Sequence, residues 1–293
     1  MSTSAYRSVF RPALFSGRVV LVTGAGSGIG RCCAHELAAL GASLALLGRN
    51  ADKLAAVANE LGPTGVAVST HPADIRDAQA VQAAVGAALE RHGRIDGLVN
   101  NAGGQFPAPA ETITPGGWEA VLATNLTGGF FVAREVYLQS MKAHGGAIVN
   151  MLADIWNGMP GIAHWGAARA GMLSFTESAA CEWASAGVRV NAVAPGWIAS
   201  SGLDTYDDAL KAQLRHLQTV VPVRRFGTAS EVSAAIVFLL SQAASFITGS
   251  CIRIDGGVPN ARHTWPARAQ RQAGATAEFD GFHLASRSRM LDE

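Results

Sequence analysis

Short apolar runs alternate with longer, alanine-rich stretches of helical period between residues 18 and 257, and this rhythm constrains the fold more than any other feature. Continuous apolar strands separated by helices imply a parallel sheet that helices cover on both faces. The expected strands are 18–23, 43–47, 66–70, 95–100, 147–151, 188–193 and 251–254. The helical patterns begin near Gly28, Asp52, Asp77, Trp118, Ile162, Asp204 and Ser230. The sequence therefore predicts an α/β fold with a single doubly wound parallel sheet and no second domain.

Composition narrows the class of protein. Of the 293 residues, 49% are hydrophobic and 15% are charged, which is ample material for a large core. The formal net charge of +1 predicts no nucleic-acid partner and no membrane partner. Four cysteines without a C-x-x-C pair are typical of a reduced cytoplasmic protein, and eight scattered histidines predict no metal site.

One uncharged stretch, residues 232–252, is long enough to cross a bilayer. It contains several serines and a glycine and divides into a helix-like half and a strand-like half, so we interpret it as buried core. The N-terminal segment lacks the apolar run of a signal peptide. We therefore expect a soluble, cytoplasmic protein.

The segment 258–293 departs from the alternating pattern. It sets Trp265, Phe279 and Phe282 among small residues and arginines. A partly disordered extension is one interpretation, but three aromatic side chains favour docking on the domain or on a neighbouring subunit. We therefore divide the chain into one domain, residues 1–257, and a C-terminal extension of the same domain, residues 258–293.

A glycine-rich turn, TGAGSGIG, joins the first expected strand to the first expected helix. Gly24, Gly28 and Gly30 carry no side chains that would keep the backbone away from a pyrophosphate. The helix that follows offers free N–H groups and a favourable dipole to an anion. Such turns also occur for packing reasons alone. Because the sequence pattern predicts a strand before this turn and a helix after it, the turn predicts a dinucleotide-binding Rossmann fold.

The second expected strand ends near Gly48 and Arg49, where an acidic residue would bind the ribose 2′-hydroxyl of NAD. No acid stands there. Gly48 leaves room, and Arg49 brings a permanent charge whose planar fork suits a phosphate. We predict NADPH as the cofactor, the alternative being a surface arginine without this role.

These motifs resemble the short-chain dehydrogenase/reductase family over residues 17–257. The resemblance is carried by Thr23-Gly24-x-x-x-Gly28-Ile29-Gly30, Asp74, Asn100-Asn101-Ala102-Gly103, Asn125, Pro195-Gly196, Ser200 and Asp255-Gly256-Gly257. Together with Arg49, it implies a cofactor site made of Gly24, Ser27, Gly28, Ile29, Gly30, Asp74, Ile75, Asn101, Ala102, Gly103, Arg169, Pro195, Gly196, Ile198 and Ser200. The resemblance also implies a homotetramer.

The family's catalytic apparatus is a serine followed by Y-x-x-x-K, and this chain departs from it at every position. Trp165 stands at the tyrosine, Arg169 at the lysine and Ala153 at the serine. Reduction of a ketone leaves an alkoxide, which needs a proton from a positioned acid. Indole and guanidinium groups cannot relay protons. We therefore do not expect ordinary carbonyl reduction.

Reduction of the double bond of a 2-enoyl thioester makes a different demand. Hydride reaches the β-carbon and negative charge collects on the thioester oxygen as an enolate, which a fixed cation and hydrogen-bond donors stabilise. Arg169 can supply that charge while it holds the nicotinamide ribose, and Asn125 can support it directly or through water. The candidates for the proton donor are Tyr206, then Asp154, with His164 as a third.

The stretch HWGAARAG, which begins at His164, is similar to that of the peroxisomal trans-2-enoyl-CoA reductases, which also carry arginine in place of lysine. Bacterial relatives of this branch are associated with breakdown of branched acyl chains and acyclic terpenoids. The sequence thus indicates an NADPH-dependent 2-enoyl-thioester reductase. Two alternatives stay open: an alcohol or ketone dehydrogenase on a small hydrophobic substrate such as a terpenoid, and an NADP-binding protein without activity.

Overall fold

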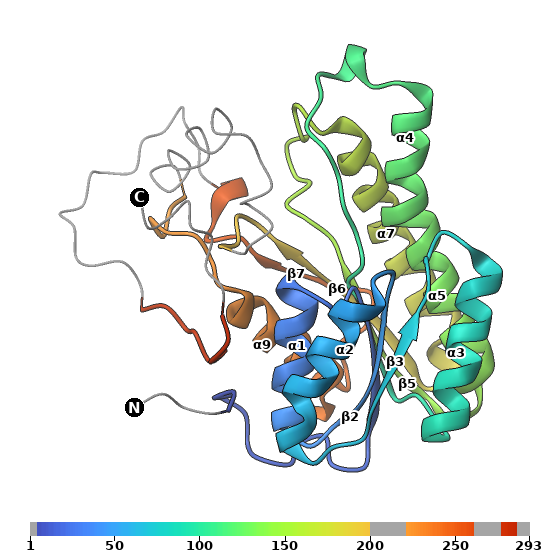
Figure 1. Ribbon diagram of the computed structural model, residues 1–293. Helices are drawn as coiled ribbons and strands as arrows, with labels where there is room; N and C mark the ends of the chain where they lie inside the picture. The colour runs from blue at the N-terminus through green and yellow to red at the C-terminus, as the bar shows by residue number, and fades with distance from the viewer. Residues whose placement is uncertain (1–4, 200–220, 261–276, 286–293) are drawn as a thin grey trace.

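The computed structural model describes residues 5–199, 221–260 and 277–285. Its centre is a seven-stranded sheet in which all neighbours are parallel and the order is β3-β2-β1-β4-β5-β6-β7 (Figure 1). The strands are β1 (Val19–Thr23), β2 (Ser43–Gly48), β3 (Val68–Pro72), β4 (Gly97–Asn100), β5 (Gly146–Met151), β6 (Val188–Pro195) and β7 (Cys251–Ile254). The order reverses between β1 and β4, which creates a crevice at the carboxyl ends of these strands. The prediction of a doubly wound parallel sheet is confirmed.

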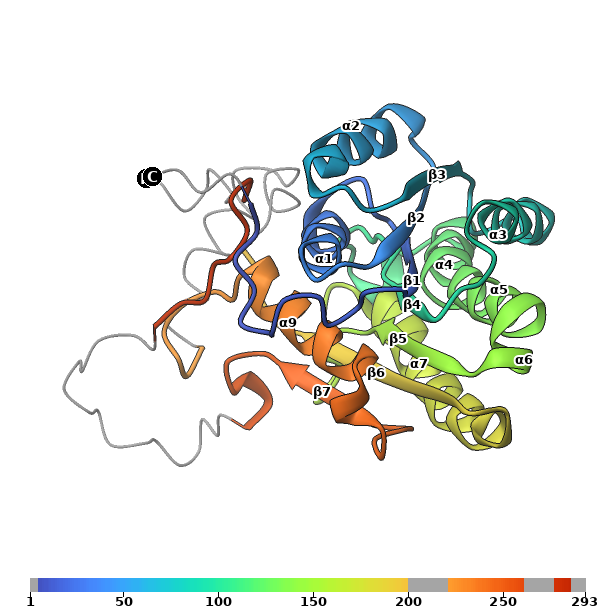
Figure 2. The same ribbon diagram turned by 90° about the horizontal axis from the view of Figure 1, so that it is seen from below.

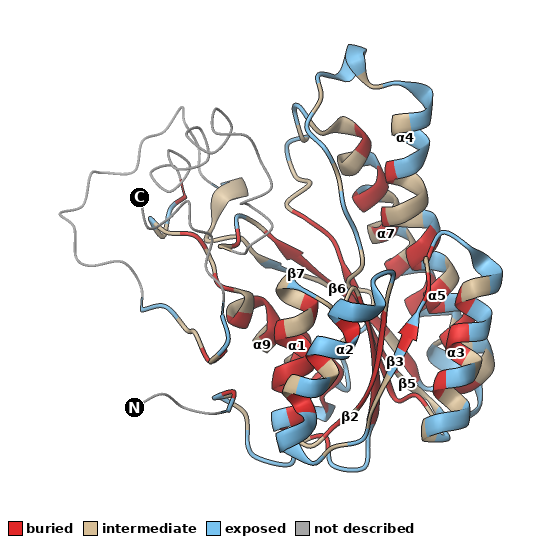
Figure 3. Ribbon diagram, in the orientation of Figure 1, coloured by how far each residue is buried: buried red, intermediate tan, exposed pale blue. Residues whose placement is uncertain are grey.

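Helices cover both faces of the sheet (Figure 2). One face carries α1 (Gly28–Ala39), α2 (Ala51–Leu61) and α9 (Ala229–Leu240), and the other carries α3 (Ala78–His92), α5 (Gly128–Val136) and α7 (Ala163–Glu182). α4 (Pro115–Leu122) runs into α5 through a π-helical segment, Ala123–Thr127, and α6 (Lys142–His144) leads into β5. The central strands and the inward sides of the helices are buried (Figure 3), which explains why these strands read as continuous apolar runs.

Polar side chains determine where several helices begin. Asp77 and Thr114 accept hydrogen bonds from backbone N–H groups in the first turns of α3 and α4. Thr228 and Glu231 form a reciprocal capping box at the start of α9. Because Thr114 caps the helix and Pro115 suits its first position, α4 begins earlier than the apolar pattern predicted.

The expected strand 66–70 is displaced toward the C-terminus in the structure. The ladder between β2 and β3 pairs Leu44 with Val68 and Gly48 with Pro72. β3 is an edge strand, where a proline without an N–H group is tolerated. The helix expected near Asp204 lies outside the described residues, as does Trp265 of the extension.

The described part of the C-terminal extension, residues 277–285, packs against the domain. The Thr228 hydroxyl at the start of α9 donates to the Phe279 carbonyl oxygen at 2.7 Å. Phe282 is buried beside Tyr6 of the N-terminal arm, with the ring centroids 6.0 Å apart. The two ends of the described chain therefore meet on the face of the sheet that α1 and α9 cover.

A buried carboxylate on α1, Glu36, ties the N-terminal arm to the helices. It accepts hydrogen bonds from the hydroxyls of Tyr6 at 3.1 Å, Ser8 at 2.7 Å and Ser233 at 2.5 Å. Burial raises the pKa of Glu36 although these donors oppose the shift. The arm, α1 and α9 thus form one packed unit.

Within the described residues, no helix combines the length and the apolar composition needed to cross a membrane. The uncharged stretch 232–252 instead forms most of α9 and the beginning of β7. Its side chains Val232, Ile236 and Leu239 belong to the core between α9 and the sheet.

Replacing Phe282 should show whether the docked segment 277–285 stabilises the domain. Phe282→Ala is expected to lower the free energy of unfolding by about 2–3 kcal/mol, because it removes a buried aromatic ring from its contacts with Tyr6 and Cys32. The control Phe246→Ala removes a fully exposed ring and should change stability by less than about 0.5 kcal/mol. Chemical denaturation followed by circular dichroism measures both, and equal effects would contradict the expectation.

Candidate active site

A cleft of about 1380 Å³ lies at the carboxyl ends of the strands. Its walls come from the segments that follow each strand from β1 to β6, so it occupies the crevice that the strand order creates. It brings together the expected residues Gly24, Ser27, Ile29, Arg49, Asp74, Ile75, Asn101, Ala102, Gly103, Asp154, Arg169, Pro195, Gly196 and Ile198. Two further expected residues, Ser200 and Tyr206, lie outside the described part of the chain.

The glycine-rich turn forms the floor of this cleft. Gly24 and Gly28 have φ angles of +64° and +53°, which favour glycine. Gly30 lies so close to Asn101 that a Cβ on Gly30 would come within 2.6 Å of Asn101 Nδ2. Ser27 makes no side-chain cap and the first turn of α1 holds no acidic residue, so its N–H groups are available to an anion. The turn therefore fits a pyrophosphate.

Thr23 and Asn101 join this turn to the segment after β4. Thr23 Oγ1 accepts hydrogen bonds from the N–H groups of Asn101 and Ala102, both at 2.9 Å. Asn101 Nδ2 donates in return to the Thr23 carbonyl oxygen at 2.9 Å. These bonds fix the separation of the two segments that flank the cleft.

Basic residues gather where β2 and β3 end. Arg49, Lys53 and Arg76 all line the cleft, and Arg76 pairs with Asp74 through contacts of 2.5–3.0 Å. Hydrogen bonds from Arg76 lower the pKa of Asp74 to about 2, and the charge of Arg49 adds to the shift. Because Arg76 neutralises Asp74, Arg49 and Lys53 leave a positive potential suited to a ribose phosphate. Sequence reasoning missed Lys53 and Arg76, since only the fold brings them beside Arg49.

Arg169 projects from α7 into the opposite end of the cleft and is only 4% exposed. Its Nη1 donates to the Met151 carbonyl oxygen at 2.7 Å, and its Nε has no hydrogen-bond partner. Burial lowers the pKa of this guanidinium to about 10, so it stays charged at neutral pH. Among the described residues, no carboxylate lies within ion-pair distance of it. A buried cation of this kind gains most from a ligand that brings negative charge.

Trp165, the residue expected at the tyrosine of the Y-x-x-x-K motif, is held by Asn125. The indole Nε1 donates to Asn125 Oδ1 at 3.2 Å, and the Arg169 Cζ lies 5.8 Å from the centroid of the indole ring. Asn125 lies in the π-helical segment, where its Nδ2 donates to the carbonyl oxygens of Gly104 at 2.6 Å and Val121 at 2.9 Å. Both amide hydrogens are therefore engaged, so Asn125 holds Trp165 and Gly104 in place in this arrangement.

Three residues are candidates for the proton donor, and of the two that the structure describes, Asp154 lines the cleft. It follows Ala153 in the segment after β5, and its Oδ1 is buried without a hydrogen-bond partner. Burial raises the pKa of its carboxyl group. His164 is instead buried against Phe106, with ring centroids 4.6 Å apart, and does not line the cleft. In the part of the chain that is described, no three His, Cys, Asp or Glu side chains are grouped so as to hold a metal ion.

Comparison with known proteins agrees with this geometry. The family model described as enoyl-(acyl carrier protein) reductase matches residues 24–259. The chain belongs to the short-chain dehydrogenase/reductase family. It is therefore an NAD(P)-dependent oxidoreductase by family.

Individual relatives differ in what their names state. The Bacillus subtilis (strain 168) protein named "Probable 2,4-dienoyl-CoA reductase" is 38% identical over 244 residues, which are 82% of this chain and 96% of that protein. The 3-oxoacyl-[acyl-carrier-protein] reductase FabG of Staphylococcus aureus is 37% identical over 240 residues, 81% of this chain and 96% of that protein. The solved structure of the citronellol catabolism dehydrogenase AtuB of Pseudomonas aeruginosa PAO1 is 56% identical, with a TM-score of 0.78, and covers 87% of this chain and all of that one.

A methyl group added at Gly103 should disturb the buried cation. A Cβ at Gly103 would come within 2.7 Å of Asn125 Oδ1 and would also overlap Arg169 Nη2. Gly103→Ala is therefore expected to lower the free energy of unfolding by about 1–3 kcal/mol and to weaken cofactor binding. The neighbouring Gly104 has open space at the same atom, so Gly104→Ala should leave both unchanged. Thermal unfolding and cofactor titration compare the two variants, and equal behaviour would contradict the packing described.

Proposed function

We propose that this protein is an NADPH-dependent reductase of the carbon–carbon double bond of 2-enoyl thioesters, of the enoyl-CoA type. The observation that carries the proposal is the buried guanidinium of Arg169, which has no carboxylate partner among the described residues. The dinucleotide supplies a hydride when it is bound. The protein then has to stabilise the negative charge that develops on the substrate, and Arg169 is placed in the cleft to do so.

The residues around Arg169 favour an enolate over an alkoxide. A newly formed alkoxide needs an acid beside its oxygen. The indole N–H of Trp165 is already donated to Asn125, and Ala153 carries no hydroxyl group. An enolate spreads its charge toward the thioester oxygen, and a fixed cation in a water-poor site lowers its energy without giving up a proton.

The choice of NADPH rests on the basic end of the cleft. Arg49 and Lys53 line it, while Arg76 is paired with Asp74. A ribose 2′-phosphate would bring two negative charges to this potential, whereas a 2′-hydroxyl would bring none.

The names of relatives support reduction of a double bond. The matching family model and the Bacillus subtilis relative both carry the names of reductases that act on unsaturated acyl groups. FabG carries the name of a reductase of 3-oxoacyl groups. This chain departs from the family's serine, tyrosine and lysine at Ala153, Trp165 and Arg169, which separates it from ordinary carbonyl reduction.

A second candidate function is oxidation of an alcohol on a terpenoid substrate. The observation in its favour is the 56% identity to AtuB, which is named a citronellol catabolism dehydrogenase. Citronellol is a branched acyclic terpenoid alcohol, so the comparison also supports a branched acyl group if the substrate is a thioester. An alcohol dehydrogenase of this kind would need a base at the substrate hydroxyl, a role that Trp165 cannot fill.

NADPH oxidation separates these functions directly. We expect the purified protein to reduce crotonyl, longer 2-enoyl and branched 2-enoyl thioesters of coenzyme A, and to act poorly on matched ketones and on citronellol with NADP⁺. Turnover of alcohols or ketones without any reduction of enoyl thioesters would favour the second candidate. Binding of NADPH without turnover of either class would indicate a cofactor-binding protein without activity.

The family resemblance extends the proposal to assembly and location. We propose a cytoplasmic homotetramer in which residues 258–293 belong to the same domain as residues 1–257. Light scattering of the purified protein measures its mass in solution, and a monomer would contradict the tetramer.

Cofactor preference should depend on Arg49. Arg49→Ala is expected to reduce the preference for NADPH over NADH by about 10- to 100-fold, because it removes a charge-assisted hydrogen-bond donor from the phosphate. Its affinity for NADH should change little. Arg91→Ala, which removes an exposed arginine at the end of α3, is the control. Fluorescence titration with NADPH and NADH measures the preference. The proposal requires this preference to fall in Arg49→Ala and to stay unchanged in Arg91→Ala.

Catalysis should depend on the charge of Arg169 more than on the indole of Trp165. Arg169→Ala is expected to lower kcat for enoyl thioesters by about 10²- to 10³-fold, because the enolate loses its cation. Trp165→Phe keeps most of the packing and removes one hydrogen bond to Asn125, so a loss of about 5-fold is expected. Steady-state kinetics compares the two. A larger loss in Trp165→Phe than in Arg169→Ala would contradict this assignment.

A further inference from the structure

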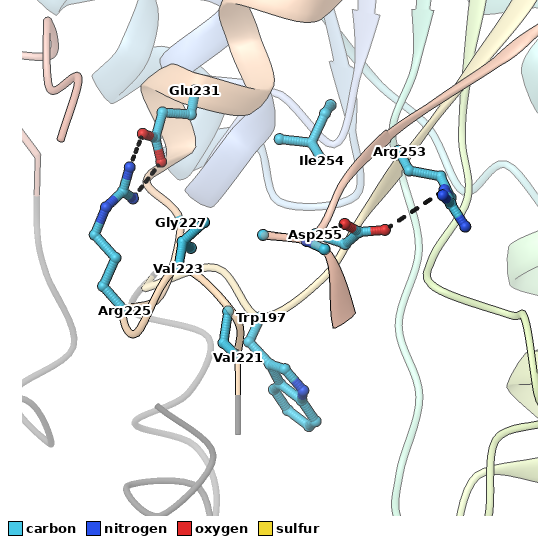
Figure 4. A pocket seen from close by; sticks show the side chains of 11 residues that line it. Trp197, Val221, Val223, Arg225, Gly227, Glu231, Arg253, Ile254 and Asp255 are labelled. Carbon is cyan, nitrogen blue, oxygen red and sulfur yellow. Dashed lines mark hydrogen bonds and ion pairs between the residues drawn. The ribbon is translucent and has the colours of Figure 1, made fainter. Parts of the chain in front are cut away.

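A second, smaller pocket of about 350 Å³ lies beside the cleft and shares Trp197 with it (Figure 4). On one side of this pocket, Arg225 and Glu231 form a two-pronged ion pair at 2.6 and 2.8 Å. On the other side, the Asp255 carboxylate points toward Arg253, with 3.8 Å between Asp255 Oδ2 and Arg253 Nε. The first pair is closed by short hydrogen bonds, whereas Asp255 Oδ2 is buried and makes no hydrogen bond.

Asp255 interacts electrostatically with Asp154, the acid in the wall of the main cleft. Asp255 follows β7 and Asp154 lies after β5, two strands that flank β6 in the sheet. Gly196, which follows β6, packs closely on Asp255, because a Cβ there would come within 2.8 Å of Asp255 Cα. Asp154 lines the cleft and Asp255 lines the smaller pocket, at the ends of the two strands that flank β6.

When Asp154 and Asp255 are both ionised, their two negative charges exceed the single positive charge of Arg253. Arg253 is the cation that acts on Asp154, and the segment 152–162 contains no other charged residue. Burial and the negative charge of Asp255 raise the pKa of Asp154, while Arg253 and a hydrogen bond from the Trp156 N–H oppose the shift. Asp154 Oδ1 and Asp255 Oδ2 are each buried without a donor. A proton on Asp154 would lower the cost of burying its unpartnered oxygen and would remove the repulsion between the two carboxylates.

We propose that Asp154 is the acid that protonates the α-carbon of the substrate, and that Asp255 is a positioning residue that acts through Asp154. This inference rests on the proposed reduction of enoyl thioesters. Asp154 lines the same cleft as Arg169, and Arg169 is anchored on Met151 in the chain segment that leads to Asp154. The backbone from Met151 to Asp154 therefore holds both the cation that stabilises the enolate and the acid that protonates its α-carbon.

The step balances with the reactants already named. Hydride adds to the β-carbon and the double-bond electrons move onto the thioester oxygen. When the carbonyl re-forms, the enolate electron pair makes a new bond between the α-carbon and the proton of Asp154, whose oxygen–hydrogen bond breaks. The Asp154 carboxylate then takes a proton from water. One hydride and one proton are consumed for each double bond reduced.

Deuterium labelling tests the role of Asp154. In D₂O, the wild type should place deuterium at one of the two α-hydrogen positions of the product. Asp154→Asn should lower kcat by about 10²-fold or more, because proton transfer by a positioned acid is lost, and should give label at both positions. Asp154→Glu should recover part of the rate and of the selectivity. The affinity for NADPH should be unchanged in each variant, and this measurement checks that the variants are folded. The exposed control Glu90→Gln should match the wild type in rate and in labelling.

The pH dependence of kcat tests Asp255. A donor must be protonated to act, so the wild-type kcat should be highest below the pKa of Asp154 and fall as pH rises through it. Asp255→Asn removes a negative charge that raises this pKa, so the fall should move to lower pH while activity at low pH persists. In Asp154→Asn the fall should disappear.

The outcomes separate the two proposals. A wild type that does not reduce enoyl thioesters would overturn the proposed function and the role of Asp154 with it. A wild type that reduces them, together with an Asp154→Asn variant that keeps both its pH profile and its labelling at one α-position, would overturn the role of Asp154 alone. An unchanged pH profile in Asp255→Asn would remove Asp255 from the assignment.

Discussion

The hydrogen bond between the Arg169 guanidinium and the Met151 carbonyl holds a charge inside the protein, and one part of the cleft is built around it. Gly103 leaves the space, and the indole ring of Trp165 faces the guanidinium. Burying an arginine without a carboxylate costs free energy, and an apolar side chain of similar volume would pack there at lower cost. The retained charge is understandable if a ligand or a reaction intermediate uses it.

Charge along the cleft changes in an order that suits the proposed reaction. Arg49 and Lys53 bring positive charge to the part of the cleft after β2, Arg169 places a single buried cation in the wall formed by α7, and Asp154 brings a carboxyl group in the segment after β5. A phosphate is attracted to the first end, and an oxygen that gains negative charge is stabilised beside the buried cation. In the proposed reaction Asp154 donates the proton, so separate groups of one cleft serve anion binding and proton donation.

The fold could be predicted from sequence because the information is local: apolar runs bury seven strands, and TGAGSGIG joins the first of them to a helix. The predicted element boundaries were wrong where a local apolar pattern competes with another interaction. The ladder between β2 and β3 begins at Val68, and the helix cap of α4 lies before the first apolar residue of that helix. Arg49 was evident because its place follows directly from a strand end. Lys53 and Arg76 were not, since their approach to Arg49 depends on how α2 and the segment after β3 pack. The bond from Trp165 to Asn125 was equally hidden, because a π-helical turn creates it.

In the proposed reaction the indole of Trp165 also belongs to the surroundings of Arg169. Its ring faces the guanidinium, and its N–H shares the Asn125 oxygen with the Gly104 N–H. Exclusion of water from such a site would strengthen the attraction between Arg169 and an enolate. It also limits protonation of the α-carbon by passing water, so that a fixed acid decides the face that receives the proton. Under the proposed function, an indole at the expected position of the phenol and a carboxyl group elsewhere in the cleft are thus two parts of one change in chemistry.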